Sequence, residues 1–218
     1  NNKKKFSKIS SYSSKYITNC FNLALELVKN NDNTALINGP ISKQHFLKKK
    51  FLGITEYIAS KVNSKKNVML IYNKKLAVSP ITTHLPLKYV AKEITKKKII
   101  NNVIEIKKFY KNFLNKVPKI AILGLNPHCE TIDSYSEEKK IIIPAINYLQ
   151  KINLNVDGPY PADTFFLKKN INKFDVVVGM YHDQVLTPLK TLYNFKAINL
   201  TIGLPFIRIS PDHGPNEK

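Results

Sequence analysis

The apolar residues of this 218-residue chain fall mostly in short continuous runs that stop abruptly at polar residues. The clearest run covers 176–180 and ends at Tyr181-His182-Asp183-Gln184. An amphipathic segment over 185–193 and a second β-rich run over 197–204 follow. Continuous apolar runs are typical of strands buried on both faces, and a period of 3.6 is typical of the helices between them. This stretch therefore predicts a strand, a polar loop, a helix and a strand of an α/β protein.

The same alternation extends over the rest of the chain. Further strands are predicted over 35–37, 67–72, 75–79 and 119–123, and further helices from 14, over 87–114 and over 137–150. We expect a hairpin between 67 and 79 at an edge of the fold, and a rigid, proline-rich loop over 158–164. Residues 1–218 are predicted to be a single α/β unit cut from a longer protein, with a loose segment over 1–13.

Three of the five histidines directly follow predicted strands, namely His84, His128 and His182. Open α/β sheets bind ligands at the carboxyl ends of their strands, and catalytic zinc sites often use three protein ligands. The three residues are too far apart in sequence to form a local metal motif, so a site requires neighbouring strand ends to converge. A lone histidine is more often an ordinary polar residue, but three at equivalent positions favour a metal site.

Arg208 is the only arginine among 35 Lys and Arg residues, and it follows the end of the last predicted strand. A planar guanidinium can bind phosphate or carboxylate through two parallel hydrogen bonds, which an ammonium group cannot do. One arginine can also persist by chance in a lysine-rich chain. Composition alone leaves both interpretations open.

The net charge of +20 and the pI of about 9.8 raise the possibility of a nucleic-acid partner. The lysines are spread over the whole chain, however, which favours solvated faces over a binding stripe. Two cysteines provide no disulfide framework, and no apolar run has the length of a membrane span. We therefore expect a cytoplasmic protein with no nucleic-acid and no membrane partner.

The glycine-rich dinucleotide fingerprint, the Walker loop and the G-x-S-x-G elbow are absent from the sequence. Their absence disfavours a Rossmann dehydrogenase of the usual kind, a P-loop NTPase and an α/β hydrolase.

The motifs of the chain, taken together, resemble those of the 4-hydroxythreonine-4-phosphate dehydrogenase family. The resemblance covers nearly the whole chain from Ala35 on. The motifs that carry it occur in the family's order and are Asn38-Gly-Pro, Thr55-Glu56, Thr82-Thr-His-Leu-Pro-Leu87, Gly124-Leu-Asn-Pro-His128, Gly158-Pro-Tyr-Pro-Ala-Asp-Thr164, Met180-Tyr-His-Asp-Gln184, Asn199, Gly203-Leu-Pro-Phe-Ile-Arg208 and Asp212-His-Gly214.

This resemblance implies an isocitrate/isopropylmalate-dehydrogenase-like α/β fold, with a mostly parallel sheet flanked by helices and a small subregion that contains the hairpin. It implies a homodimer that binds NAD and a divalent metal, with zinc favoured over magnesium or cobalt. One histidine of the metal site would come from the partner subunit, and His182 is the candidate for it. The implied site residues are His84, His128 and His182 for the metal, Thr55, Lys190, Asn199 and Arg208 for the substrate, Lys190 and Asp163 for catalysis, and His213 and Gly214 for the cofactor.

The implied reaction is the oxidation of 4-phosphohydroxy-L-threonine to a β-keto acid, which decarboxylates to 3-amino-2-oxopropyl phosphate in pyridoxal 5'-phosphate biosynthesis. Ile54 stands where the family usually has a histidine, so one substrate hydrogen bond is lost. An alternative is therefore a related dehydrogenase for another phosphorylated hydroxy acid, such as threonate or erythronate phosphate. A basic nucleic-acid-binding protein is the remote alternative.

Overall fold

The computed structural model describes residues 13–31, 34–47, 50–51, 53–64, 66–132 and 135–211, so most of the segment expected to be loose lies outside the described residues. The strands of the described part are β1 (Ala35–Ile37), β2 (Val68–Tyr72), β3 (Ala77–Thr82), β4 (Ile120–Leu123), β5 (Val156–Tyr160), β6 (Val176–Tyr181), β7 (Ile198–Ile202) and β8 (Ile207–Pro211). They form one eight-stranded sheet in the order β1-β8-β7-β2-β3-β6-β4-β5.

The sheet is mixed, with parallel pairs in the majority. The pairs β3–β6, β6–β4, β4–β5 and β1–β8 are parallel. The pairs β2–β3, β2–β7 and β7–β8 are antiparallel. The predicted mostly parallel α/β fold is therefore confirmed. The hairpin of β2 and β3 is found where predicted in the sequence, but it lies in the middle of the sheet, because β7 and β6 pair with its two outer sides.

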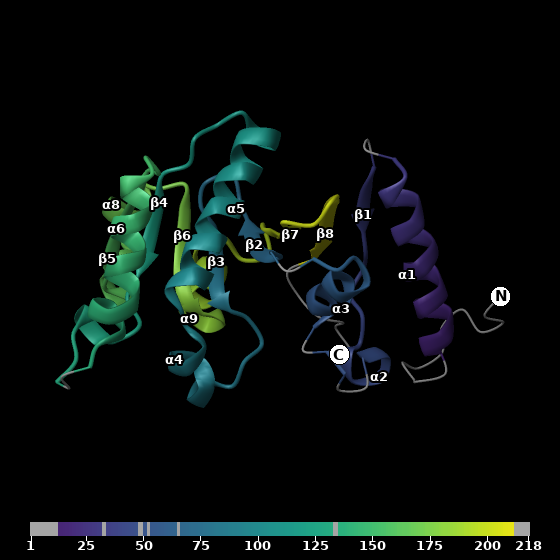
Figure 1. Ribbon diagram of the computed structural model, residues 1–218, viewed down its shortest axis with the longest axis horizontal. Helices are drawn as coiled ribbons and strands as arrows, with labels where there is room; N and C mark the ends of the chain where they lie inside the picture. Colours follow the sequence, from purple (N-terminus) through teal and green to yellow (C-terminus); the bar gives the residue numbers. More distant parts are fainter. Residues whose placement is uncertain are drawn as a thin grey trace.

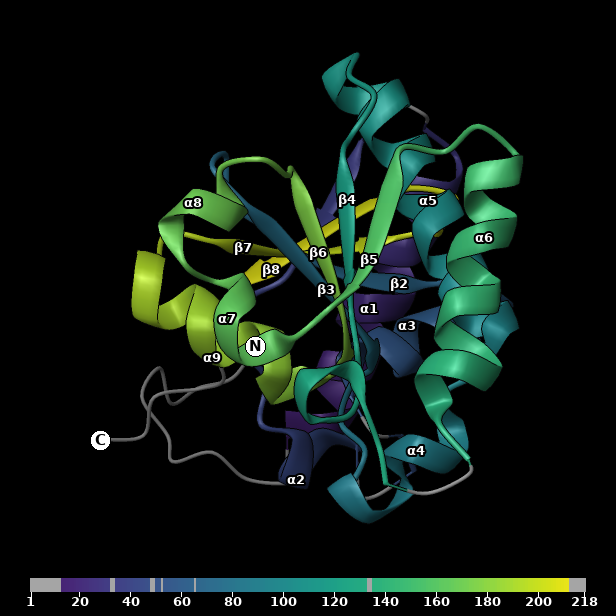
Figure 2. The same ribbon diagram turned by 90° about the vertical axis from the view of Figure 1, so that its left-hand side faces the viewer.

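Helices cover both faces of this sheet (Figures 1 and 2). The α-helices are α1 (Ser14–Lys29), α2 (Lys43–Leu47), α3 (Ile54–Lys61), α4 (Val90–Glu93), α5 (Lys96–Leu114), α6 (Ile143–Lys151), α7 (Ala162–Phe165), α8 (Lys168–Ile171) and α9 (His182–Tyr193). Short turns of other helix types are η2 (Leu87–Tyr89), η3 (Pro127–Cys129) and the π-helical η4 (Glu138–Ile142). Helices α5 and α6 lie on one face of the sheet, and α7, α8 and α9 lie on the other. None of the described helices combines the length and the apolar character that crossing a membrane requires.

Strand β6 shows why the apolar runs are continuous. Val176 and Val178 pack with the residues of α5 and α6, whereas Val177 packs with those of α9 on the opposite face. All three side chains are fully buried, so neither face of the strand has room for a polar residue. A third apolar cluster, around Phe21, Phe46 and Tyr57, joins α1, α2 and α3 to the β1 edge of the sheet.

Three local predictions were wrong. The polar residues after β6 do not form a loop, because α9 begins at His182 and its first turn contains them. The start of the predicted rigid loop is the edge strand β5, which pairs with β4. Arg208 lies within β8 and not beyond the end of a strand. In each case polar residues or prolines concealed a regular element, a helix in the first case and a strand of the sheet in the other two.

Candidate functional site

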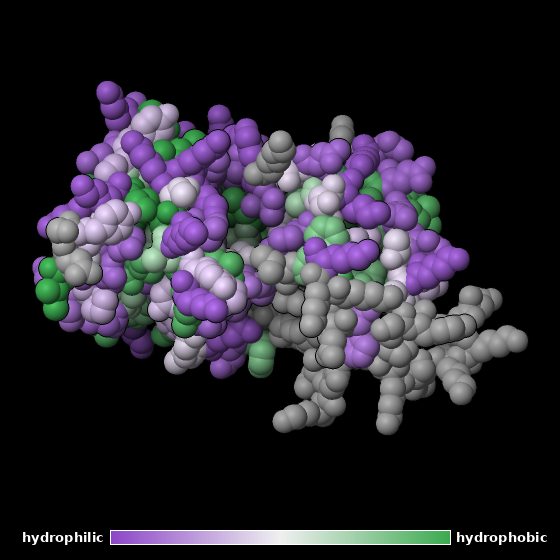
Figure 3. All heavy atoms as spheres, turned by 60° about the horizontal axis from the view of Figure 1, so that its bottom comes forward, coloured by the Kyte–Doolittle hydropathy of each residue, from purple (hydrophilic) through white to green (hydrophobic). Residues whose placement is uncertain are grey.

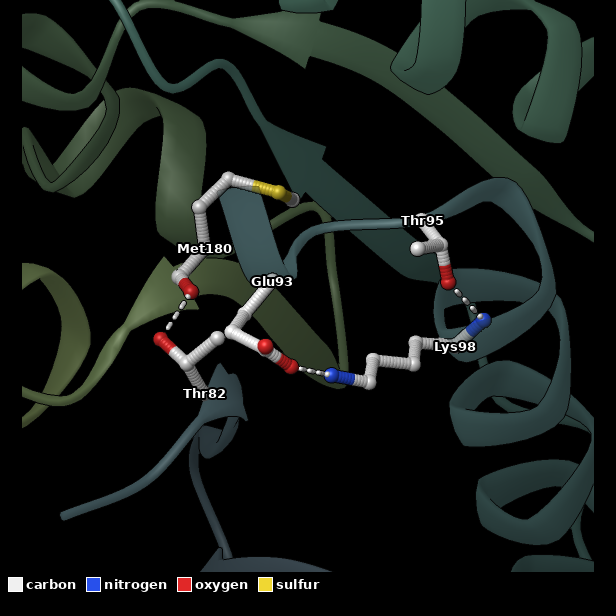
Figure 4. Close-up of polar contacts among 5 residues, drawn as sticks. All are labelled: Thr82, Glu93, Thr95, Lys98 and Met180. Atoms are coloured by element: carbon white, nitrogen blue, oxygen red, sulfur yellow. Dashed lines mark hydrogen bonds and ion pairs between the residues drawn. The ribbon is translucent and has the colours of Figure 1, made fainter. Parts of the chain in front are cut away.

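Two of the three candidate histidines lie side by side after the ends of β3 and β6. These strands are parallel neighbours with Thr82 opposite Tyr181, so the residues that follow them emerge at the same edge of the sheet. The Thr82 hydroxyl donates to the carbonyl oxygen of Met180 over 2.8 Å and ties the two strand ends together (Figure 4). The ring centroids of His84 and His182 are 5.7 Å apart. The predicted convergence of neighbouring strand ends is therefore correct for this pair.

Both histidines line a cavity of about 420 Å³ on the α9 face of the sheet. Its walls come from the loop after β1, the start of α3, strands β2, β7 and β8, and α9. The other polar lining residues are Asn38, Thr55, Lys190, Asn199, Arg208 and Ser210, and the apolar lining includes Ile41, Ile54, Met69, Ile71 and Leu186. All four residues that were predicted to contact the substrate thus line the same cavity as the two histidines.

Arg208 is a buried cation in the wall of this cavity, with 3% of its surface exposed. Its Nε donates to Asn38 Oδ1 over 2.9 Å, and its Nη1 donates to the hydroxyls of Thr201 (3.0 Å) and Thr55 (3.4 Å). Burial lowers the pKa of the guanidinium to about 10, and the Glu56 carboxylate acts in the opposite direction. The side chain is therefore still charged at neutral pH, and its hydrogen bonds within the described residues go to neutral groups. An anion in the cavity would balance this charge.

Asn199 and Lys190 add polar groups to the cavity from β7 and α9. Asn199 Oδ1 is buried and accepts no hydrogen bond from any described residue. Leaving such an acceptor unsatisfied costs about 1–3 kcal/mol, which a donor on a bound molecule would recover. The Lys190 ammonium lies 5.5 Å from the centre of the Phe195 ring. The two residues offer a ligand one acceptor and one positive charge.

Gly53 leaves space behind His84 for an acidic side chain. A Cβ atom on Gly53 would lie 2.7 Å from Glu56 Oε2 and 3.0 Å from His84 Nδ1, which is too close. The backbone there is extended (φ −161°), so space and not conformation favours glycine. The Thr83 hydroxyl donates to Glu56 Oε1 over 3.2 Å and fixes the carboxylate near His84.

The third candidate histidine does not join this cavity. His128 projects from η3, beside α7, with 75% of its side chain exposed, and its Nδ1 lies 4.0 Å from Asp163 Oδ2. That distance is too long for a hydrogen bond. Within the described residues, no three His, Cys, Asp or Glu side chains are grouped so that they could hold a metal ion. One chain therefore brings two of the predicted metal ligands together and leaves His128 and the predicted catalytic Asp163 outside the cavity.

His182 lies beside His84 in the cavity of its own chain, and His128 lies apart from both. Which of the three histidines crosses a subunit interface stays a prediction. The predicted cofactor residues His213 and Gly214 lie outside the described residues, and their role stays a prediction.

Two neutral residues that hold the site together were missed in the sequence. Thr201 lies opposite Arg208 on the paired strand and accepts its hydrogen bond. Gln184 accepts from the Met180 N–H and donates to the Gly124 carbonyl oxygen, both over 2.7 Å, and so joins the ends of β6 and β4. The signal for Thr201 was a threonine within the apolar run 197–204, and the signal for Gln184 was a glutamine among the polar residues that end the run 176–180.

The chemistry of the two histidines fits a divalent metal ion. His182 Nδ1 lies 2.9 Å from the Asp183 carboxylate, the arrangement that commonly orients a metal-binding histidine and leaves Nε2 for the ion. His84 offers a second imidazole from the same cavity wall. Two imidazoles leave coordination positions for another protein ligand and for a substrate oxygen. Zinc and other divalent ions that accept imidazole suit this set of donors.

The sheet topology and the cavity beside its strand ends define a class of protein. The isocitrate dehydrogenase of Methylococcus capsulatus superimposes with a TM-score of 0.52 at 12% identity, over 87% of this chain and 62% of that chain. At this level of identity the similarity concerns the fold alone. The chain has an isocitrate-dehydrogenase-like α/β fold.

Closer matches identify the family. The family described as "Pyridoxal phosphate biosynthetic protein PdxA" matches residues 1–216, and the chain belongs to it. The 4-hydroxythreonine-4-phosphate dehydrogenase of Sulfurihydrogenibium sp. is 47% identical over 184 residues, which are 83% of this chain and 56% of the relative. The crystal structure of the Klebsiella pneumoniae 4-hydroxythreonine-4-phosphate dehydrogenase superimposes with a TM-score of 0.81 at 31% identity, over 95% of this chain and 64% of that chain. The chain thus spans less than two thirds of the length of these relatives.

Proposed function

We propose that this chain forms the substrate- and metal-binding part of a dehydrogenase that oxidises 4-phosphohydroxy-L-threonine, with NAD as cofactor and zinc as the favoured metal. The β-keto acid product would decarboxylate to 3-amino-2-oxopropyl phosphate, in pyridoxal 5'-phosphate biosynthesis. One observation carries the proposal: His84, His182, Lys190 and Arg208 line a single cavity. The names of the relatives reported above agree with this substrate.

The two kinds of charged group in the cavity would have different tasks. Arg208 binds the phosphate group, since its planar guanidinium is already fixed and desolvated in the cavity wall. Lys190 balances the substrate carboxylate and the negative charge that develops as CO₂ leaves. A divalent ion held by the histidines would polarise the substrate hydroxyl, and the nicotinamide would accept the hydride.

His128 completes the proposed metal site from a second copy of the chain. In a two-fold symmetric homodimer, each subunit would give His84 and His182 to its own cavity and His128, with Asp163, to the cavity of its partner. The high exposure of His128 and its separation from the cavity of its own chain support this exchange.

Turnover measured before and after treatment with a chelator tests the proposed reaction. We expect oxidation of 4-phosphohydroxy-L-threonine with NAD to stop when the metal is removed and to return when Zn²⁺, Mg²⁺ or Co²⁺ is added back. Turnover that no chelator affects would contradict the metal requirement. A protein that binds metal and NAD but never oxidises this substrate would contradict the substrate assignment.

Ile54 supports a second candidate function. It is 8% exposed and lines the cavity beside Thr55, so an apolar group faces the ligand where the family resemblance places a histidine. A phosphorylated hydroxy acid that does not need this hydrogen bond, such as threonate or erythronate phosphate, would also fit. We expect kcat/KM to be highest for 4-phosphohydroxy-L-threonine and to rise further in Ile54→His. A higher value for threonate or erythronate phosphate would select the alternative.

A cytoplasmic location and the absence of a nucleic-acid partner belong to the same proposal. Hydrophilic residues are distributed over the face in Figure 3 and are not gathered in one stripe. The lysines behind the net charge of +20 are spread along the whole sequence, and charge without a basic stripe attracts nucleic acid only weakly and non-specifically. A duplex-binding titration at physiological salt should therefore show no tight complex.

A further inference from the structure

The loop that carries His128 is fastened to a buried carboxylate that the proposed chemistry does not use. Glu138 lies in η4 and is 1% exposed. Its Oε1 accepts hydrogen bonds from the backbone N–H groups of Leu125 and Asn126, both over 2.8 Å. Its Oε2 accepts from Asn126 Nδ2 and from the Ser136 hydroxyl, both over 2.9 Å. Both carboxylate oxygens are therefore fully used in holding the loop.

The loop needs such a fastening because its backbone is strained. His128 and Cys129 have φ values of 54° and 61°, in the left-handed region that residues other than glycine rarely adopt. Each such residue brings its Cβ close to a carbonyl oxygen, a steric cost that other contacts must offset. A geometry of this kind persists only where the surroundings enforce it, and it is concentrated at functional positions.

The contact between the loop and the carboxylate is also sterically tight. A Cβ atom on Gly124 would lie 2.7 Å from Cys129 Sγ and 3.2 Å from Glu138 Oε1. The strand end therefore passes directly against the acid, and the loop closes back over it. Burial by itself raises the pKa of Glu138, but the hydrogen bonds from Asn126 and Ser136 outweigh it and hold the pKa below its ordinary value. An ionised acceptor makes stronger hydrogen bonds than a neutral one.

We propose that Glu138 is a positioning residue for His128. Its carboxylate fixes the loop over 124–129 so that the imidazole projects from the surface in one orientation before a metal ion and a partner subunit arrive. A ligand held in this way loses less conformational entropy when it binds. This inference rests on the proposed function, in which His128 is a metal ligand.

Cobalt binding to the purified protein, followed by the visible absorption of the bound ion, tests this role. Glu138→Gln keeps the shape of the side chain and removes its charge, and we expect the Kd for Co²⁺ to rise about 10- to 100-fold, as for other groups that orient metal ligands. Glu105→Gln is the matched control, because Glu105 is also buried (8% exposed) but pairs with Lys108 on α5. This control should bind Co²⁺ as the wild type does.

A double-mutant cycle separates positioning from a general structural effect. In the His128→Ala background, Glu138→Gln should cause no further loss of Co²⁺ affinity, because no imidazole remains to be oriented. A further loss of the same size would overturn the inference. If Glu138→Gln does not fold, Ser136→Ala is the replacement test variant, because it removes one of the four hydrogen bonds to the Glu138 carboxylate. It should weaken Co²⁺ binding severalfold, and wild-type affinity would overturn the inference.

Two outcomes distinguish a failure of this inference from a failure of the proposed function. If His128→Ala weakens Co²⁺ binding and the folded Glu138→Gln protein does not, the positioning role is wrong and the ligand assignment stands. If His128→Ala binds Co²⁺ as tightly as the wild type, His128 is not a ligand, and both proposals are overturned.

Discussion

The two regions that carry the candidate histidines are built in different ways. His84 and His182 follow neighbouring strands near the centre of the sheet, and their rings are 5.7 Å apart in the wall of one cavity. His128 lies near the β5 edge with Asp163, and their side chains are 75% and 55% exposed. The first region is enclosed by its own chain, whereas the second presents its polar groups outward. The comparison teaches that strand order and register decide which strand-end residues meet.

The register of the sheet explains the difference. Strand β3 ends level with β6, since Thr82 pairs with Tyr181. Strand β4 pairs Ile122 with Val178 and ends one residue later, while β6 continues to Tyr181. The chain after β4 therefore leaves the sheet earlier, and it packs against β5 and α7. A residue just after a strand reaches the cavity here only when that strand ends level with β6, as β3 does and β4 does not.

Loss of a histidine should have the largest effect and is the most direct way to test the comparison. We expect His84→Ala, His128→Ala and His182→Ala each to reduce turnover more than about a hundredfold, because each would remove a proposed metal ligand and not merely a group that orients one. When His84→Ala and His128→Ala subunits are mixed and exchanged, the hybrid dimer has one site with both changes and one site with neither. A random mixture should then recover about a quarter of wild-type activity.

The control for this experiment is a mixture of His84→Ala with His182→Ala. Both residues lie in the same cavity of the same chain, so no hybrid contains an intact site and no activity should return. Recovery in this control, with none in the first mixture, would show that His182 crosses the interface. Absence of recovery in both mixtures, despite proven subunit exchange, would contradict a shared site.

Arg208→Lys should have the next largest effect and concerns the enclosed region alone. A lysine cannot reproduce the guanidinium's bonds to both Asn38 and Thr201, and it supplies only a point charge for the phosphate. We expect a loss of about 1.5–3 kcal/mol in substrate binding, or roughly tenfold to over a hundredfold in kcat/KM, with unchanged affinity for Co²⁺ and NAD. Wild-type kcat/KM with a lowered melting temperature would make Arg208 a structural residue only.

These two regions also mark how far the sequence alone predicts the site. The apolar runs predicted most of the strands correctly, and their polar ends led to His84 and His182. Composition singled out Arg208, because it is the one arginine of a lysine-rich chain. Periodicity carries no information on strand order, however, so it could not show that the loop with His128 turns away. Nor could it show that Thr201 and Gln184 would be buried next to the site. Gln184 bonds to Gly124, 60 residues away, and Thr201 meets Arg208 only through the pairing of β7 with β8.

Gly53→Ala should have a moderate effect within the enclosed region. The added Cβ would lie 2.7 Å from Glu56 Oε2 and 3.0 Å from His84 Nδ1, so one of these side chains must move. We expect the Kd for Co²⁺ to rise about tenfold, the lower part of the range for groups that orient metal ligands. Gly39→Ala is the matched control, because a Cβ there would meet no atom within 4 Å. Equal affinities in the two variants would show that the space at Gly53 does not matter for His84.

The smallest expected effects come from the acid beside each histidine, and they compare the two regions directly. Asp183 lies 2.9 Å from His182 Nδ1, whereas Asp163 lies 4.0 Å from His128 Nδ1. Only the first pair is within hydrogen-bond distance, and its strength is limited because the Asp183 side chain is 76% exposed. We expect Asp183→Asn to raise the Kd for Co²⁺ severalfold and Asp163→Asn to change it less than about twofold, since water and salt screen the second pair.

If Asp163→Asn weakened Co²⁺ binding more than Asp183→Asn, the exposed region would be the better organised of the two. If Asp163→Asn instead lowered kcat with little change in metal affinity, its carboxylate would act on the substrate in the partner's cavity, the catalytic role that the family resemblance implies.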